Sequence, residues 1–285
     1  MQFIDLAKQQ SLIKTNLDKR IQDVLAHGKY IMGPEIKEME AQLAEYVGVK
    51  HCVSCSSGTD ALLMPLLAWD VGPGDAVFTT PFTFIATAEV IQLLGATPIF
   101  VDIDPKTYNI SPELLDDAIT EVIEKGELNP KVIIPVDLFG LPADYAAIEL
   151  ISKKYDIKIL EDAAQGFGGQ IDDRLAGSFG DAASTSFFPA KPLGCYGDGG
   201  AIFTDDDELY EKLVSVRVHG KGGDKYDNVR IGLNGRMDTL QAAIVLEKFT
   251  LFPTEVKLRN KVADQYSALL SDRVVVPEVS SGYTS

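Results

Sequence analysis

The chain has 285 residues, of which 46% are hydrophobic, and this is enough to bury a large core in one main domain with a smaller appendage. Its formal net charge of −16 argues against nucleic acid and anionic membranes as principal partners, because both attract clustered lysine and arginine. No basic N-terminal segment precedes an apolar stretch, and no apolar run is long enough to span a bilayer, so we expect a cytoplasmic protein.

Strand-like and helix-like segments alternate along most of the chain. Runs rich in apolar or β-branched residues predict strands at 76–80, 97–101, 131–135 and 157–160. Apolar side chains at helical spacing predict helices at 57–69, 83–94, 111–124 and 143–155. Ser111 and Pro112 have the pattern of a helix start, and Gly95 that of a helix end. This order predicts an α/β fold with a mainly parallel sheet flanked by helices.

The first motif that suggests chemistry is a C-x-x-C pair, Cys52 and Cys55, which is compatible with redox chemistry or zinc binding. A structural zinc site needs four nitrogen or sulfur ligands, but the chain has no second cysteine pair and only His51 lies nearby. We therefore expect no metal. The total of three cysteines fits a reducing compartment.

Small residues at 55–60 precede a predicted helix and include Ser57, Gly58, Thr59 and Asp60. Backbone N–H groups that converge at such a helix start form a phosphate site, although an ordinary helix cap is the alternative interpretation. The segment lacks the Gly-Lys-Ser/Thr ending of a Walker A loop, and no G-x-G-x-x-G follows any predicted strand. A dinucleotide-binding fold is therefore disfavoured.

Two further junctions between strands and helices carry candidate side chains. Phe84 follows the strand at 76–80 and is suited to stack on a flat ring, although a phenylalanine at such a junction is commonly part of the core. Asp162 follows the strand at 157–160, at the sheet edge where ligands bind in open α/β folds. It either caps a helix or keeps a ligand nitrogen protonated through a charge-assisted hydrogen bond.

Lys191 is the most informative residue, because its neighbours Phe187–Pro189 and Pro192 are apolar and a glycine-rich loop follows. Desolvation disfavours the ammonium form and lowers the pKa of a lysine toward that of a nucleophilic amine, whereas a solvated surface lysine is the alternative. A reactive lysine, an acid for a ring nitrogen, a phosphate site and an aromatic side chain are together what pyridoxal 5′-phosphate (PLP) requires. The sequence therefore predicts PLP as the cofactor.

Several segments, in order along essentially the whole chain, resemble the DegT/DnrJ/EryC1/StrS family of PLP-dependent aminotransferases, which act on nucleotide-linked sugars and have the fold-type I architecture. These segments are residues 28–34, 57–62, 81–84, 102–104, 161–165, 186–200 and 232–238. Residues 187–200 are most similar to members that aminate C3 of UDP-2-acetamido-2-deoxy-3-oxo-glucuronic acid, with glutamate as donor, for bacterial surface polysaccharide.

One departure leaves the choice of sugar open, because close relatives can carry serine where this chain has Ala190. The alternatives are an aminotransferase that acts at C4, or at C3 of a dTDP-keto-deoxy sugar. A PLP-dependent lyase or dehydratase on the same scaffold is a further alternative.

The resemblance implies roles for the matching residues around the cofactor. Lys191 would carry PLP as a Schiff base and move the proton between substrate and cofactor. Asp162 would keep the pyridine nitrogen protonated, Gln165 would contact the ring hydroxyl, and Phe84 would stack on the ring. The phosphate would be held by Gly58, Thr59, Asp60, Ser186 and, from a neighbouring subunit, Asn234. An active site shared in this way implies an obligate homodimer.

Residues 217–236 form a cationic stretch in an otherwise acidic chain. Its cationic and histidine side chains are Arg217, His219, Lys221, Lys225, Arg230 and Arg236. An anionic nucleoside diphosphate sugar would gain from such a stretch, although a solvated loop is the alternative for Lys221 and Lys225. The resemblance implies that Gly28, Tyr30 and Arg236 contact the sugar nucleotide.

The resemblance also predicts the domain organisation: residues 1–250 form a large PLP-binding domain whose N-terminal segment contributes to the substrate site. Residues 251–285 form a linking helix and the start of an incomplete small C-terminal domain. Within them the sequence predicts a helix from Pro253, with an apolar face, and a strand at 274–276; the apolar residues are Leu258, Val262, Tyr266 and Leu269. Family members continue beyond Ser285, so we expect a truncated chain that is weakly active or poorly stable.

Overall fold

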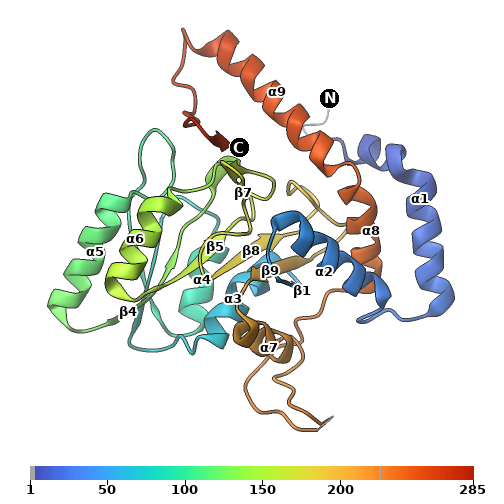
Figure 1. The fold of residues 1–285 in the computed structure, drawn as a ribbon, viewed down its shortest axis with the longest axis horizontal. Helices are drawn as coiled ribbons and strands as arrows, with labels where there is room; N and C mark the ends of the chain where they lie inside the picture. The colour runs from blue at the N-terminus through green and yellow to red at the C-terminus, as the bar shows by residue number, and fades with distance from the viewer. Residues whose placement is uncertain (1–3, 225) are drawn as a thin grey trace.

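The computed structural model describes residues 4–224 and 226–285, and Figure 1 shows a central sheet with helices packed on both faces. The sheet has seven strands in the order β1-β9-β8-β5-β4-β2-β3. Strand β9 runs antiparallel to β1 and β8, and the other neighbouring pairs are parallel, so the predicted sheet is confirmed. The strands are β1 (His51–Cys55), β2 (Asp75–Thr79), β3 (Thr97–Phe100), β4 (Asn129–Ile134), β5 (Lys158–Asp162), β8 (Ala182–Ser186) and β9 (Gly200–Thr204).

Helices cover both faces of the sheet because side chains alternate along its strands. In β4, Val132 and Ile134 pack with α3, α4 and α7, whereas Ile133 between them packs with α5 and α6. Ala201 of β9 packs on the second face, against α2 and α8. The helices are α1 (Leu6–His27), α2 (Pro34–Val47), α3 (Gly58–Ala68), α4 (Ala86–Leu93), α5 (Pro112–Lys125), α6 (Tyr145–Tyr155), α7 (Asp207–Val216), α8 (Thr239–Phe249), α9 (Phe252–Leu270) and the 3-10 turn η1 (Leu138–Gly140). Within the described residues, no helix is long and apolar enough to cross a membrane.

The predicted helix signals are confirmed. Pro112 is the first residue of α5, and the Leu114 N–H donates a hydrogen bond to the Ser111 hydroxyl at 3.4 Å. Helix α4 ends just before Gly95, whose φ of +75° lies in the left-handed region that favours glycine. This helix begins later than predicted, at Ala86, because residues 81–83 form a bend instead.

The C-terminal predictions are confirmed for the helix but wrong for the strand. Residues 274–276 pair with no other strand, and a run of valines is extended only where a partner strand supplies hydrogen bonds. A short strand lies later instead, in a three-stranded sheet of β10 (Tyr283–Thr284), β6 (Gln170–Ile171) and β7 (Arg174–Leu175). The predicted apolar face of α9 is exposed, since Leu258, Val262, Tyr266 and Leu269 are all largely accessible.

Cys52 and Cys55 are free thiols buried in β1. Because they are three residues apart in a strand, they point to opposite faces of the sheet. Cys52 packs in the cluster of α2 and α8, and Cys55 in the cluster of α3. Burial raises the pKa of both thiols. The C-x-x-C pair is therefore part of the core, and the two sulfur atoms do not share a site.

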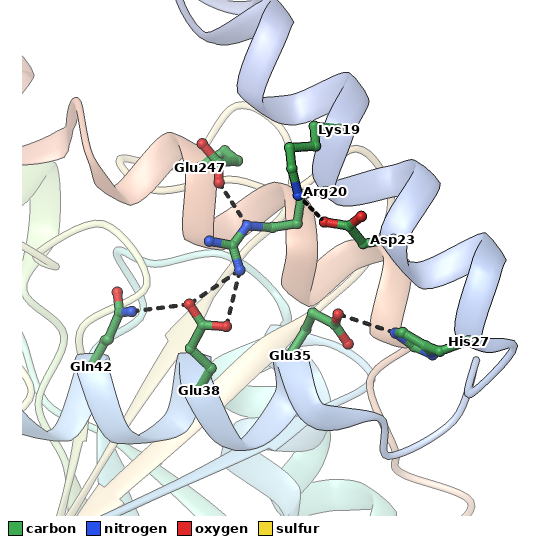
Figure 2. A network of polar contacts seen from close by, with 8 residues as sticks. All are labelled: Lys19, Arg20, Asp23, His27, Glu35, Glu38, Gln42 and Glu247. Atoms are coloured by element: carbon green, nitrogen blue, oxygen red, sulfur yellow. Dashed lines mark hydrogen bonds and ion pairs between the residues drawn. The ribbon is translucent and has the colours of Figure 1, made fainter.

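Helix α1 is held against α2 and α8 by apolar contacts and by a guanidinium between two carboxylates. The apolar contacts join Ile13 and Leu17 of α1 to Ile244 of α8. Figure 2 shows Arg20 of α1, whose Nε donates to Glu247 of α8 at 2.6 Å and whose Nη1 donates to Glu38 of α2 at 2.9 Å. The side chain of Glu247 is only 8% exposed, so its charge depends on this partner.

Replacement of Arg20 tests this contact. We expect Arg20→Gln to lower the free energy of unfolding by about 2 kcal/mol, because it leaves the Glu247 carboxylate buried without a cation. Lys19→Gln is the matched control, since it breaks only the exposed pair with Asp23 and is expected to change stability by less than about 0.5 kcal/mol. Urea denaturation measures both, and equal effects of the two substitutions would contradict the prediction.

Candidate active site

A cavity of about 710 Å³, here called the main cavity, lies where the carboxyl ends of β5 and β8 meet the start of α3. Strand ends of a parallel sheet and helix N-termini are where ligands bind in α/β proteins. Most of the predicted cofactor residues line this cavity. They are Gly58, Thr59, Phe84, Asp162, Gln165, Ser186 and Lys191.

The start of α3 forms a cradle of the size of a phosphate group. The N–H groups of Gly58 and Thr59 belong to the first turn, and within the described residues they have no hydrogen-bond acceptor. Ser186 closes the other side, because a Cβ atom on Gly58 would lie 2.6 Å from the Cβ of Ser186 and 2.8 Å from its Oγ. Only glycine fits here, so free amides and a hydroxyl face the same space.

Asp60 lies beside this cradle but does not line the main cavity. Its N–H donates to the Ser57 hydroxyl at 3.0 Å, and its carboxylate accepts hydrogen bonds from the hydroxyls of Ser56 and Ser57. Ser57 and Asp60 therefore form a helix cap, which was the alternative interpretation of this segment. Gly58 and Thr59, which lie between them, form the cradle.

Asp162 is the last residue of β5 and is 5% exposed. Its Oδ2 accepts a hydrogen bond from the Thr87 hydroxyl at 2.8 Å, and its Oδ1 accepts one from the Ala164 N–H at 3.2 Å. Burial raises the pKa of this carboxyl, while the two hydrogen bonds and the charge of Lys191 act in the opposite direction. No helix follows β5, so Asp162 does not cap one.

Lys191 lies in the loop between β8 and β9, and its amine faces the same cavity as Asp162. Backbone hydrogen bonds hold this loop: the Lys191 N–H donates to the Phe188 carbonyl at 2.9 Å and the Cys195 N–H donates to the Phe187 carbonyl at 2.7 Å. Burial lowers the pKa of the Lys191 amine, and the Asp162 carboxylate opposes that shift. The expected desolvated lysine is therefore present.

Gln165 and Phe84 line the main cavity from two different segments. The Gln165 side-chain carbonyl accepts a hydrogen bond from the Phe139 N–H at 3.0 Å, which leaves its NH₂ group free to donate. The Phe84 ring is 66% exposed at the cavity rim. It is therefore not a core residue of this chain.

The four other predicted residues lie outside the main cavity, in two segments that the fold brings together. Arg236 donates from Nε and Nη2 to the Asn234 side-chain oxygen, at 3.0 and 2.6 Å. The backbone of Tyr30 accepts a hydrogen bond from the Thr239 N–H at 2.9 Å, close to Gly28, which ends α1. The predicted substrate residues therefore lie near one another, but outside the cavity that contains Lys191 of the same chain.

Only some side chains of the cationic stretch at residues 217–236 are exposed on the surface. Arg217 is buried, and its Nη1 donates to Glu40 at 2.6 Å and to the Ser54 carbonyl at 3.0 Å, so it joins α2 to β1. Lys221 is exposed, and Lys225 lies outside the described residues.

Sequence reasoning missed four polar residues that line the cavity: Thr83, Thr87, Asp198 and Arg259. Thr87 lies four residues after Thr83, and the two hydroxyls are 2.9 Å apart, so helical spacing was a usable signal. Arg259 is far along the chain on α9, and nothing local marks it.

Behind the cavity lies a buried pair of carboxyls, Asp137 and Glu161, that interact electrostatically. The Oδ1 of Asp137 also accepts from the Tyr145 hydroxyl at 2.8 Å and from the Ala143 N–H at 3.1 Å. The Asp137 N–H donates to the carbonyl of Asp162 at 3.0 Å, so the pair supports the strand end that carries Asp162. Burial raises the pKa of Asp137 to about 7 and that of Glu161 well above its usual range. Burial therefore favours the neutral form of both carboxyls.

Comparison with known proteins gives matches over nearly the whole chain. A profile of the DegT/DnrJ/EryC1/StrS aminotransferase family matches residues 11–281. Over 270 residues the chain is 52% identical to a UDP-2-acetamido-2-deoxy-3-oxo-D-glucuronate aminotransferase from Pseudomonas aeruginosa, a match that covers 95% of this chain and 73% of that protein.

Solved structures match equally well. A crystal structure of a DegT DnrJ EryC1 StrS aminotransferase from Brucella abortus has a TM-score of 0.99 and 53% identity, and covers 100% of this chain and 76% of that chain. The structure of NtdA from Bacillus subtilis with bound cofactor PMP has a TM-score of 0.88 and 33% identity, and covers 99% of this chain and 64% of that chain.

The pH dependence of unfolding tests the buried carboxyl pair. Because the folded pKa of Asp137 lies above its ordinary 3.8, the native state binds more protons, and stability falls as the pH rises through about 7. Asp137→Asn removes this titrating group, so we expect a shallower fall in the free energy of unfolding over that range. The exposed Asp173, changed to Asn, is the control and should leave the slope unchanged. An unaltered slope in Asp137→Asn would contradict the prediction.

Proposed function

This chain belongs to the DegT/DnrJ/EryC1/StrS aminotransferase family, and from that membership we propose that it transfers an amino group from glutamate to C3 of UDP-2-acetamido-2-deoxy-3-oxo-glucuronic acid. Its cofactor is PLP, and its fold is that of PLP-dependent aminotransferases. The observation that carries the proposal is the pairing of Lys191 and Asp162 across the main cavity, in a chain 52% identical to a protein named for this reaction. The aminated sugar would serve bacterial surface polysaccharide.

The residues of the main cavity fit PLP. The two free amides of Gly58 and Thr59, with the hydroxyl of Ser186, suit the phosphate, because anions bind at helix N-termini. Asp162 suits the pyridine nitrogen, since its carboxylate is held in place by Thr87 and is shielded from water. When bound, the cofactor supplies an electron sink that stabilises charge on the substrate carbon.

Lys191 moves the proton in this proposal. Its Nζ would take a proton from the donor carbon and pass it to the cofactor, and in the other half of the reaction it would move a proton from the cofactor to the sugar carbon. This requires an amine that is neutral part of the time. Burial of Lys191 lowers its pKa in that direction. Asp162 would instead bind the ring nitrogen of the cofactor, so the two side chains perform separate tasks within one cavity.

We place the sugar nucleotide between subunits of a homodimer in the cytoplasm. Asn234 and Arg236 lie outside the main cavity of their own chain, next to the segment that carries Gly28 and Tyr30. At the rim of the main cavity the Phe84 ring is 66% exposed, an apolar surface that a second copy would cover. A twofold arrangement would bring each Asn234 and Arg236 to the partner's cavity.

An assay with a panel of substrates tests the proposed reaction. The holoenzyme is incubated with glutamate and each of several UDP- and dTDP-linked keto sugars, and 2-oxoglutarate and the aminated product are followed by mass spectrometry. We expect the largest kcat/KM with the 3-oxo-glucuronate. Transfer only to a 4-keto sugar would correct the position, and a cofactor-loaded protein that transfers to no keto sugar would refute the function.

Subunit mixing tests the shared site. Lys191→Ala and Arg236→Ala should each be inactive, but the two proteins unfolded and refolded together should regain about a quarter of wild-type activity, because half of the dimers then hold one intact site. The control mixes Lys191→Ala with Asp162→Asn, two changes in the same cavity, and should regain none. Equal recovery in both mixtures, or none in either, would contradict a shared site.

A further inference from the structure

Helix α9 presents one face to the main domain, and that face contains Phe252, Val256 and Arg259 at helical spacing. The first two are core residues: Phe252 is 1% exposed, and Val256 packs against the same cluster as α2 and α8. One turn later this face reaches the main cavity, which Arg259 lines. The burial of Phe252 and Val256 therefore directs Arg259 toward the cofactor residues.

The rotation of α9 is fixed by a close approach to the turn that follows Asp162. A Cβ atom on Gly168 would lie 2.8 Å from Phe252 Cζ and 2.9 Å from Val256 Cγ2, so the helix leaves no room for rotation there. The Phe252 ring also stacks on Phe167, with centroids 5.5 Å apart. Arg259 is thus placed by a rigid contact, although its own side chain is solvent-accessible.

One cation of the main cavity has no protein partner among the described residues. Among the described residues that line it, the cations are Lys191 and Arg259, and the anions are Asp162 and Asp198. Lys191 interacts with Asp162 and, in the proposed function, reacts with the cofactor, so it is not available to hold a carboxylate. Arg259 makes no hydrogen bond or ion pair with any residue of 4–224 or 226–285, so its guanidinium is available to an anion.

We propose that Arg259 binds a carboxylate of the amino donor. The inference rests on the proposed aminotransferase function with glutamate as donor. Glutamate would bring two carboxylates into a cavity whose anions, Asp162 and Asp198, repel them, and Arg259 is the lining cation without a protein partner that offsets this repulsion. The planar guanidinium matches a carboxylate with two parallel hydrogen bonds.

The sugar acid also carries a carboxylate that Arg259 could bind. The position of Arg259 favours the amino donor over the sugar as its ligand. Arg259, Gln165, Phe139 and Pro192 also line a second cavity of about 610 Å³, between α9 and residues 274–285. The predicted sugar-nucleotide residue Arg236 lies outside both cavities. Arg259 therefore lies where the two cavities adjoin, apart from the predicted sugar-nucleotide residue Arg236.

Substitutions of Arg259 test the assignment without loss of the fold, because the side chain has no partner in the described residues. The holoenzyme is mixed with glutamate alone, and its cofactor absorbance gives the apparent Kd for the donor. Calorimetry gives the Kd for glutarate, a dicarboxylate that cannot react. We expect Arg259→Ala to raise the Kd for glutamate and the Kd for glutarate by about 10-fold or more. Arg259→Lys should have an intermediate effect, because lysine keeps the positive charge but lacks the planar guanidinium that forms two parallel hydrogen bonds.

Lys261→Ala is the control, since Lys261 is an exposed cation of α9 that lines neither cavity, and both constants should stay at the wild-type value. The KM for the keto sugar should change less than about 2-fold in Arg259→Ala. An unchanged Kd for glutamate and glutarate, or a rise confined to the keto sugar, overturns the inference while leaving the function standing. A wild-type holoenzyme that does not react with glutamate refutes the donor itself and both proposals with it.

Discussion

The opposite charges of Asp162 and Lys191 are the constraint on which this site depends. Each group is desolvated, and burial disfavours the charge of each, but each also favours the charge of the other. Their pKa values therefore depend on position, and a shift of either side chain changes both. This explains why Asp162 is the last residue of a buried strand and is hydrogen-bonded on both oxygens.

The loop of Lys191 is fixed from outside the cavity by α8. The Tyr196 N–H donates to the Gln241 side-chain oxygen at 2.9 Å, and the Lys248 ammonium lies 5.3 Å from the centre of the Tyr196 ring. Gln241 and Lys248 are two turns apart on one face of the helix. Because α1 packs on α8 through Ile244, the N-terminal helix indirectly supports the loop that carries Lys191.

Local patterns were sufficient to predict most elements and several of the residues that line the main cavity. Strand β5 and Asp162 at its end follow from an apolar run and the rule for sheet edges, because these depend on neighbouring residues only. The apolar spacing on α9 was misleading, since several faces of that helix carry apolar residues and only tertiary packing selects the one with Phe252. Arg217 was misassigned for the same reason: its partner Glu40 is 177 residues away.

In the function proposed above, the arrangement separates cofactor chemistry from substrate choice. Gly58, Ser186 and Asp162, the proposed cofactor residues, lie at strand and helix ends fixed by the sheet, which leaves them little freedom. Tyr30 and Arg236 lie instead in connecting segments joined by backbone hydrogen bonds near Thr239. Changes in such segments leave the sheet intact, because few core side chains depend on them. A scaffold of this kind can keep one cofactor and one reaction while its connecting segments vary to accept different sugars.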